Sequence, residues 1–102
     1  MSEKDLSPEQ HALRQRLSDN LRRLRVEAKI SQEDLADLVG AHRTYVSKVE
    51  RMVANPTLDN LAALAKVLDV DALDLLAIPK QEAAGHSAAP SGRGGKRSSK
   101  DL

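Results

Sequence analysis

Five residues between positions 32 and 49 restrict the fold of this chain more than any other feature of its sequence. They are Gln32, Ala36, Gly40, Val46 and Val49. A small side chain at Ala36 allows two helices to cross at close range, and Gly40 permits a tight turn in which a Cβ atom would be penalised. Val46 and Val49 lie three residues apart and therefore share one face of a helix. This spacing predicts two short helices joined by a tight turn, with the start of the second helix protruding and its polar face outward.

Capping residues and apolar spacing divide the first 79 residues into five predicted helices. Ser7, Pro8 and Gln10 are typical of a helix start, because the serine caps, the proline fits the first turn and the glutamine closes a capping box. The expected helices run from Pro8 to about Ala28, from Ser31 to Gly40, from His42 to Arg51, from Leu58 to Leu68 after a cap at Thr57 or Asn55, and from Leu73 to Ile78 after a cap at Asp71, with Pro79 as the stop.

Leucine-rich stripes on these helices supply the expected core. Phe and Trp are absent, so Leu, Val and Ala must fill it. Spacings of three and four residues place the stripe residues on one face of the first and fourth helices. They are Leu13, Leu17, Leu21 and Leu24, followed by Leu58, Leu61, Leu64, Ala65 and Leu68. No alternating run indicates a strand. The sequence thus predicts an all-α, compact five-helix domain over residues 8–79, preceded by a flexible N-terminus at 1–7.

Basic residues are unevenly distributed, although the net charge is only +1. Clusters lie on the first helix (Arg14, Arg16, Arg22, Arg23, Arg25 and Lys29) and on the third (Arg43, Lys48 and Arg51). Separated basic patches allow a protein to bind a polyanion without being basic overall. Residues 80–102 are also basic, rich in Ala, Gly and Ser, and without periodic apolar positions, so we expect a disordered tail. It is either inert or a flexible arm that adds nonspecific attraction to phosphate.

Several functional classes lack the residues that they require. Cys is absent, which excludes disulfides and thiolate metal sites, and the three His residues show no ligand spacing. No Gly-rich phosphate loop and no nucleophile with a partner base is present. No apolar run approaches the roughly 20 residues of a membrane span, and the polar N-terminus is unlike a signal peptide. We therefore expect a cytoplasmic protein without membrane contact that is not an enzyme and needs no metal or cofactor.

The outward face of the third helix carries hydrogen-bonding side chains that suit DNA. A protruding helix of this kind fits the major groove. There Arg43 can bond both O6 and N7 of a guanine, and Thr44 offers a methyl group for thymine as well as a hydroxyl group. His42 can cap the helix or donate to a base or a phosphate. Ser47 and Lys48 lie one turn further on, where we expect contact with the DNA backbone or the groove edge.

Simpler interpretations of some of these residues stay open. Exposed arginines on a helix are usually a solvated face, and Arg22 and Arg23 fit that interpretation better than DNA contact, although phosphate contact from the first helix is possible. Tyr45, the only aromatic residue of the chain, is ambiguous. Its ring can pack on the domain while its hydroxyl group reaches a phosphate.

The segment from Leu21 to Leu76 resembles the phage-repressor and Cro type of helix-turn-helix protein, often called the XRE family. The resemblance is carried jointly by Ser-Gln-Glu-Asp-Leu-Ala at 31–36, the glycine at 40, Val-Ser-Lys-Val-Glu-Arg at 46–51 and Asn-Pro-Thr-Leu at 55–58. His-Arg-Thr-Tyr-Val-Ser at 42–47 is also similar to some small restriction–modification controller proteins. The resemblance implies a lambda-repressor-like helix-turn-helix domain.

Roles for single residues follow from this resemblance. Gln32 is similar to a glutamine that bonds a DNA phosphate and braces the recognition helix, and Arg25 and Glu50 match positions that form a structural ion pair. Met52 departs from the family pattern, which often has glycine there, so the turn after the recognition helix is expected to differ. The expected DNA-binding residues are Gln32, His42, Arg43, Thr44, Tyr45, Ser47 and Lys48.

One recognition helix touches too few base pairs to select a site in a genome, so such domains bind as two-fold dimers. The short terminal helix cannot bury all of its apolar surface, and we expect Leu73, Leu76 and Ile78 to form the dimer contact. Leu13 and Leu17 of the long first helix either pack on the domain or add to this contact. The expected function is a sequence-specific transcription regulator, most simply a repressor, that acts at the nucleoid on palindromic double-stranded DNA. Dose or a second regulatory protein would set its output. The alternative is a protein-interaction module, such as an antitoxin or a co-activator-like adaptor.

Overall fold

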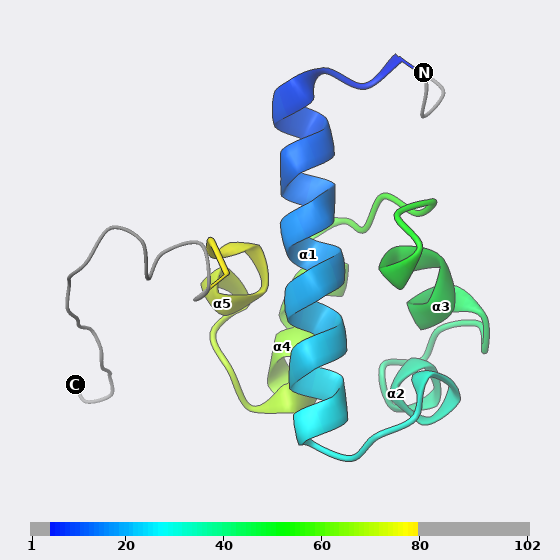
Figure 1. Ribbon diagram of the computed structural model, residues 1–102. Helices are drawn as coiled ribbons and strands as arrows, with labels where there is room; N and C mark the ends of the chain where they lie inside the picture. The colour runs from blue at the N-terminus through cyan, green and yellow to red at the C-terminus, as the bar shows by residue number, and fades with distance from the viewer. Residues whose placement is uncertain (1–4, 80–102) are drawn as a thin grey trace, which may run out of the picture.

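The computed structural model describes residues 5–79, which fold into five α-helices arranged around the first (Figure 1). The helices are α1 (Pro8–Glu27), α2 (Gln32–Leu38), α3 (Tyr45–Glu50), α4 (Leu58–Leu68) and α5 (Ala72–Leu76). α1 stands at the centre, with α2 and α3 on one side, α5 on the other and α4 behind (Figure 1). The described residues contain no strand, and the predicted all-α fold is confirmed.

Local capping explains where four of the five helices begin. Ser7 and Thr57 each form a capping box, in which the cap hydroxyl accepts a hydrogen bond from the third helical residue and that residue's side chain accepts one in return. Asp71 forms a capping box at the start of α5 with Asp74, whereas Ser31 caps α2 only by accepting a hydrogen bond from the N–H of Asp34. These predicted starts are confirmed, and Thr57 rather than Asn55 caps α4.

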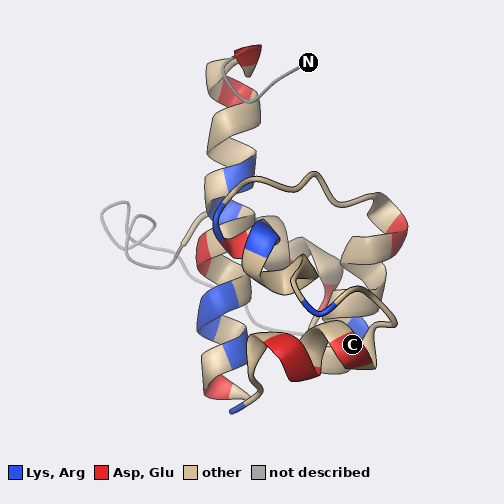
Figure 2. Cartoon of the chain, turned by 90° about the vertical axis from the view of Figure 1, so that its right-hand side faces the viewer, with Lys and Arg blue, Asp and Glu red and all other residues tan. Residues whose placement is uncertain are grey.

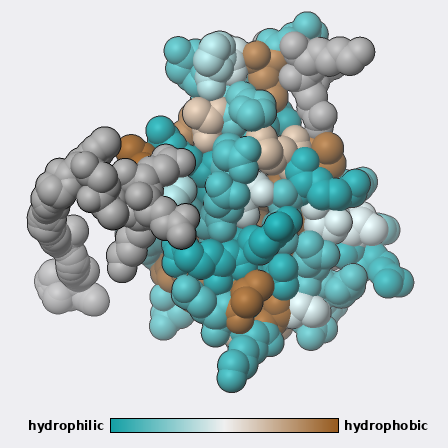
Figure 3. Space-filling model, in the orientation of Figure 1, coloured by the Kyte–Doolittle hydropathy of each residue, from teal (hydrophilic) through white to brown (hydrophobic). Residues whose placement is uncertain are grey.

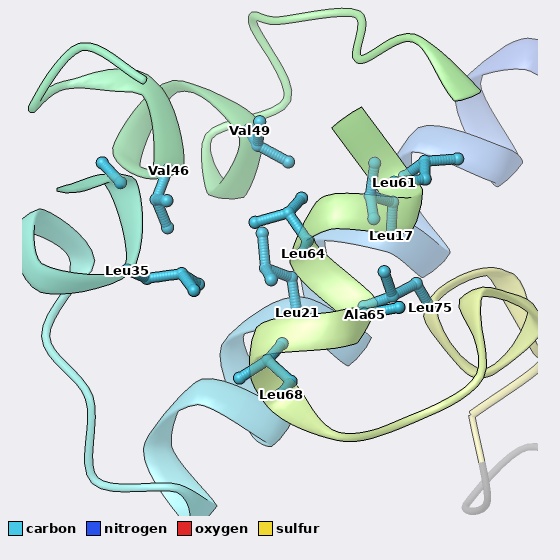
Figure 4. Close-up of a cluster of buried hydrophobic side chains, with 11 residues drawn as sticks. Leu17, Leu21, Leu35, Val46, Val49, Leu61, Leu64, Ala65, Leu68 and Leu75 are labelled. Carbon is cyan, nitrogen blue, oxygen red and sulfur yellow. The ribbon is translucent and has the colours of Figure 1, made fainter. Parts of the chain in front are cut away.

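The core consists of leucine, valine and alanine side chains that converge from all five helices (Figure 4). Its buried members are Leu17, Leu21, Leu35, Ala36, Val46, Val49, Leu61, Leu64, Ala65, Leu68 and Leu75. Burying one such leucine or valine side chain stabilises a fold by about 1.5–3 kcal/mol. Because α2, α3 and α5 are each shorter than three turns, this shared core is what holds them in place.

Two leucines of the predicted stripes are outside this core. Leu13 is 46% exposed, because the N-terminal half of α1 extends beyond the level at which the other helices pack (Figure 1). Leu58 is 81% exposed, because it is the first residue of α4 and lies off the buried face. The prediction that Leu58 belongs to the core is wrong, whereas Leu24 does pack against the core. For Leu13, exposure argues against packing on the domain, and a part in the dimer contact stays a prediction.

Two predicted segments lie mostly or wholly outside the residues that the structure describes. Residues 1–4 of the expected flexible N-terminus and the whole of the expected tail at 80–102 are not described. Residues 5–7 are described, and there Ser7 is the cap of α1. Within residues 5–79, no helix combines the length and the apolar character needed to cross a membrane. The visible surface in the orientation of Figure 1 is mostly hydrophilic, with small separate hydrophobic patches (Figure 3).

Candidate nucleic-acid interface

The turn between α2 and α3 depends on a left-handed glycine. Gly40 has φ +74°, and a Cβ atom there would meet nothing within 4 Å, so the backbone conformation and not space requires glycine. The N–H of Ala41 donates to the carbonyl of Ala36 at 2.9 Å and closes the turn. Ala36 itself is completely buried. The predicted roles of the small residue and of the glycine follow from this arrangement.

The inner face of α3 holds this helix against the domain. Val46 is 0% exposed and Val49 is 2% exposed, and both point into the core (Figure 4). α3 has only six residues, which is too short for a helix to be stable without tertiary contacts. The two valines therefore determine which side of α3 is free to face a ligand.

The segment that enters α3 presents three polar side chains to solvent. His42, Arg43 and Thr44 are all exposed. Nδ1 of His42 accepts a hydrogen bond from the backbone N–H of Thr44 at 3.2 Å and lies 2.9 Å from Oγ1 of the same residue. The His42 ring thus orders the turn in which the exposed Arg43 lies.

The third helix begins later than the sequence predicts. The expected start was His42, but α3 begins at Tyr45 and residues 43–44 form a turn. The reason is local hydrogen bonding. The N–H of Tyr45 donates to the carbonyl of His42 at 2.8 Å, three residues back, and Thr44, the residue at the cap position, makes no side-chain cap bond. Arg43 and Thr44 therefore lie in the turn that precedes α3.

Tyr45 packs inward. Its side chain is partly buried against the core, and its hydroxyl oxygen is buried without a hydrogen-bond partner among the described residues. Burial raises the pKa of this hydroxyl above its ordinary value. The position of the oxygen argues against the phosphate contact considered for it, and the ring-packing role remains. Further along α3, Lys48 is exposed and Ser47 is half-buried.

A buried carboxylate ties the end of α3 to α1 and α2. The Glu50 side chain is 0% exposed, and its two oxygens accept four hydrogen bonds. Arg25 donates from Nε to Oε2 at 2.7 Å and from Nη2 to Oε1 at 3.2 Å. Gln32 donates to Oε1 at 2.9 Å, and Arg22 donates to the same oxygen at 3.3 Å. The expected Arg25–Glu50 ion pair is present, and Gln32 braces α3 through Glu50.

These contacts keep Glu50 ionised despite its burial. Burial on its own raises the pKa of this carboxyl group. Hydrogen bonds from Arg25, Gln32 and Arg22 and the charge of Arg25 outweigh that effect, so the pKa lies below its ordinary value. Arg25 is held in turn by a 3.0 Å hydrogen bond from Nη1 to the carbonyl of Ile30. The network therefore presents a fixed geometry at neutral pH.

The turn after α3 is left-handed even without a glycine. Met52 has φ +67°, and the N–H of Val53 donates to the carbonyl of Lys48 at 2.9 Å, which is typical of a helix end with a left-handed residue. The backbone is therefore in the conformation that the family's usual glycine adopts easily. The expectation that this turn differs from that of the family stays a prediction. Met52 itself carries the strain of a positive φ.

Three residues of α1 that complete this site were not assigned to it from the sequence. Arg22 donates to Glu50, Ser18 donates from Oγ to the Glu50 carbonyl, and Arg14 donates to the Met52 carbonyl at 3.5 Å. With Arg25, they occupy positions 14, 18, 22 and 25, one face of α1 at helical spacing. That polar stripe, next to the apolar stripe, is the signal that could have identified them.

Charge is segregated on the side of the molecule that α2 and α3 form. Figure 2 shows basic bands along α1 and on α3, and acidic bands along α2. The acidic residues of α2 are exposed, namely Glu33, Asp34 and Asp37. Within residues 5–79, no group of three His, Asp or Glu side chains is placed to hold a metal ion. This side of the molecule thus presents charges of both signs.

Comparison with known proteins agrees with this geometry. The helix-turn-helix family model HTH_3 matches residues 21–75. The chain belongs to this family. Control protein C.SmaI of Serratia marcescens is 45% identical over 60 residues, which are 59% of this chain and 71% of that protein. The predicted recognition of an XRE-type helix-turn-helix is thus confirmed.

Two solved structures extend the comparison. The hypothetical transcription factor NHTF from Neisseria is 44% identical with a TM-score of 0.66, and the match covers 74% of this chain and 85% of that one. The controller protein C.Esp1396I, solved as a tetramer with its natural 35 base-pair operator, is 33% identical with a TM-score of 0.56, covering 62% and 83%. At this level the expected function is confirmed: the chain is a helix-turn-helix DNA-binding transcription regulator. The relatives named here are regulators and not enzymes.

Proposed function

We propose that this protein is a repressor that binds a palindromic operator as a homodimer through the segment 42–48. The observation that carries the proposal is the division of this segment into two sides. His42, Arg43 and Thr44 are exposed at its leading end, while Val46 and Val49 anchor its back in the core. A rigidly held, protruding set of donors is what reading the major groove requires.

Each exposed side chain has a role that its chemistry supports. Arg43 reads a guanine through O6 and N7, and Thr44 contacts a thymine methyl group or a neighbouring base. Lys48 and Ser47, one turn further along α3, bind the DNA backbone or the groove edge. The amide nitrogen of Gln32 already donates to Glu50 and has a second N–H, which is available to a phosphate oxygen.

Dimerisation is proposed to use the exposed apolar surface of α5 and the residues after it. Leu73 is 74% exposed and Ile78 is 52% exposed, whereas Leu76 is partly buried and packs against the core. Leu73 and Ile78 would therefore supply most of the contact, with Leu76 beneath them. The assembly of C.Esp1396I as a tetramer on its operator supports the idea that regulators of this family bind DNA as oligomers.

Selection of bound duplexes from a random pool tests the proposal most directly. We expect a palindrome whose half-sites are about one helical turn apart. Fluorescence anisotropy with the selected duplex should show binding that weakens steeply with salt. A protein that enriches no sequence, and that binds all duplexes weakly and alike, would instead be an interaction module such as an antitoxin or adaptor.

The dimer contact has its own test. Sedimentation velocity at tens of micromolar protein should show a dimer, and Leu73→Glu should shift it to a monomer and weaken operator binding. Leu58→Glu is the matched control, because Leu58 is exposed to a similar extent, 81% against 74% for Leu73, but lies on α4. A wild-type protein that stays monomeric, with and without operator DNA, refutes the homodimer.

A further inference from the structure

Arg22 makes the weakest of the contacts to Glu50. Its Nε lies 3.3 Å from Oε1, and that oxygen also accepts from Gln32 at 2.9 Å and from Arg25 at 3.2 Å. Arg25 contacts both carboxylate oxygens and reaches Oε2 at 2.7 Å. A fork of this kind satisfies a carboxylate by itself. Glu50 therefore does not need Arg22 as a counter-charge.

The charge count of this cluster leaves one cation without a matching anion. Glu50 contributes one negative charge, and Arg25 and Arg22 contribute two positive charges. Arg25 is the buried partner, with a side chain 14% exposed, whereas the Arg22 side chain is 60% exposed. The terminal nitrogens of Arg22 make no hydrogen bond to any residue within 5–79. An exposed guanidinium with unused planar donors suits a phosphate oxygen pair.

The position of Arg22 relates this free charge to the candidate interface. Through the shared Oε1 atom, Arg22 lies next to Gln32, the first residue of α2 and a proposed phosphate ligand. Basic bands of α1 face the same side as α3 in Figure 2. Arg14 lies two turns earlier on α1 and bonds the Met52 carbonyl at the end of α3. The polar stripe of α1 thus flanks the recognition helix.

We propose that Arg22 binds a phosphodiester of the DNA backbone beside the one that Gln32 binds, so that α1 contributes directly to the interface. This assignment rests on the proposed function, because it presupposes that α3 faces DNA. Glu50 orients Arg22 for this contact by holding its Nε, which leaves the terminal nitrogens directed outward. The contact supplies affinity without sequence preference, since a phosphate carries no base identity.

The neighbouring arginine offers a matched control. Arg23 has the same charge on the same helix, but its Nη1 lies 3.7 Å from Glu27 and its Nη2 lies 3.4 Å from the Asn20 side chain. It lines a groove with residues of α5 and the α4–α5 connection, away from Glu50. Arg23→Gln therefore removes one positive charge from α1 without removing the proposed contact.

The experiment compares Arg22→Gln, Arg22→Lys and Arg23→Gln with the wild type by fluorescence anisotropy, on the selected operator and on a scrambled duplex. The slope of log K against log salt should fall by about 0.9 for each lost phosphate contact, hence by about 1.8 for a dimer. We expect this loss for Arg22→Gln on both duplexes, little change for Arg23→Gln, and partial recovery for Arg22→Lys. Thermal melting by circular dichroism reports whether each variant is folded.

A scan with single methylphosphonate linkages, which remove the charge of one phosphate, separates contact from structure. One linkage in each half-site should weaken the wild type and Arg23→Gln but leave Arg22→Gln unaffected. An unchanged salt slope for Arg22→Gln, or a scan with the same pattern for this variant as for the wild type, overturns the assignment and leaves the proposed function standing. A wild-type protein that binds no duplex overturns both.

Discussion

Replacing Glu50 with glutamine tests whether the buried carboxylate holds the recognition helix in place. Glutamine keeps the shape of the side chain but loses the charge, and its amide group must place an NH2 where an oxygen now accepts. If the NH2 group takes the place of Oε2, it faces the Nε donor of Arg25, which lies 2.7 Å from that oxygen. If it takes the place of Oε1, it faces three donors. The variant therefore leaves the Arg25 guanidinium without its counter-charge. It opens no cavity, because the side chain keeps its size.

The expected loss can be estimated from these contacts. Removing one partner of a buried ion pair costs about 3–5 kcal/mol. Arg25 is 14% exposed and keeps its bond to the Ile30 carbonyl, and Arg22 is free to turn toward water, so we expect the lower end, about 3 kcal/mol. The free energy of unfolding of a domain of this size is roughly 4–11 kcal/mol. The substitution should therefore remove a large share of the stability.

Urea unfolding followed by circular dichroism measures this loss, and its pH dependence identifies the cause. The pKa of Glu50 is below the ordinary value of 4.5, so the unfolded chain binds the proton more readily than the folded one. The contribution of Glu50 is thus complete above about pH 4.5 and disappears as the pH falls through the folded-state pKa. The difference between wild type and Glu50→Gln should shrink over that interval.

Glu33→Gln is the control. Because Glu33 is an exposed carboxylate in the first turn of α2, its substitution should lower the free energy of unfolding by less than about 1 kcal/mol. The reasoning fails if Glu50→Gln unfolds within about 0.5 kcal/mol of the wild type at pH 7, a difference usual for surface substitutions. It also fails if the difference between the two proteins is the same at pH 3 as at pH 7.

Three further substitutions test other parts of the site. Met52→Gly should raise the free energy of unfolding by about 0.5–1 kcal/mol, because it relieves a left-handed φ, and a lower urea midpoint would contradict this. Tyr45→Phe should leave stability unchanged or raise it by up to about 1 kcal/mol, since the buried hydroxyl has no hydrogen-bond partner within residues 5–79; a lower melting temperature would reveal a hydrogen bond to it. Arg43→Ala should weaken the binding free energy by about 1–3 kcal/mol on the selected operator and by less on scrambled DNA. Equal losses on both duplexes in anisotropy would mean that Arg43 contacts a phosphate and not a base.

The sequence is sufficient to predict those features that local chemistry determines. Ser7, Ser31 and Asp71 mark helix starts because each can satisfy an unpaired backbone N–H of its own first turn. Val46 and Val49 could be assigned to the core because their spacing matches one helix face. The Arg25–Glu50 pair came from the resemblance, and its geometry agrees with that assignment.

Features that depend on the arrangement of several helices could not be predicted in the same way. Periodicity assigned Leu13 and Leu58 to apolar faces, but it does not say whether a partner helix covers that part of the face. The start of α3 was misplaced because a three-residue hydrogen bond to His42 replaces the regular helical bond. The left-handed conformation of Met52 could not be predicted, because a methionine does not indicate a positive φ.

The two stripes of α1 explain how so short a recognition helix can be held in one orientation. The apolar stripe is buried in the core through Leu17 and Leu21. The polar stripe contacts the C-terminal end of α3 through Ser18, Arg22 and Arg25. A six-residue helix cannot fix its own direction, so these polar contacts at one end and the valines along one face must do so together. Substitutions at Ser18 or Arg25 should therefore change operator affinity even though neither residue is proposed to touch DNA.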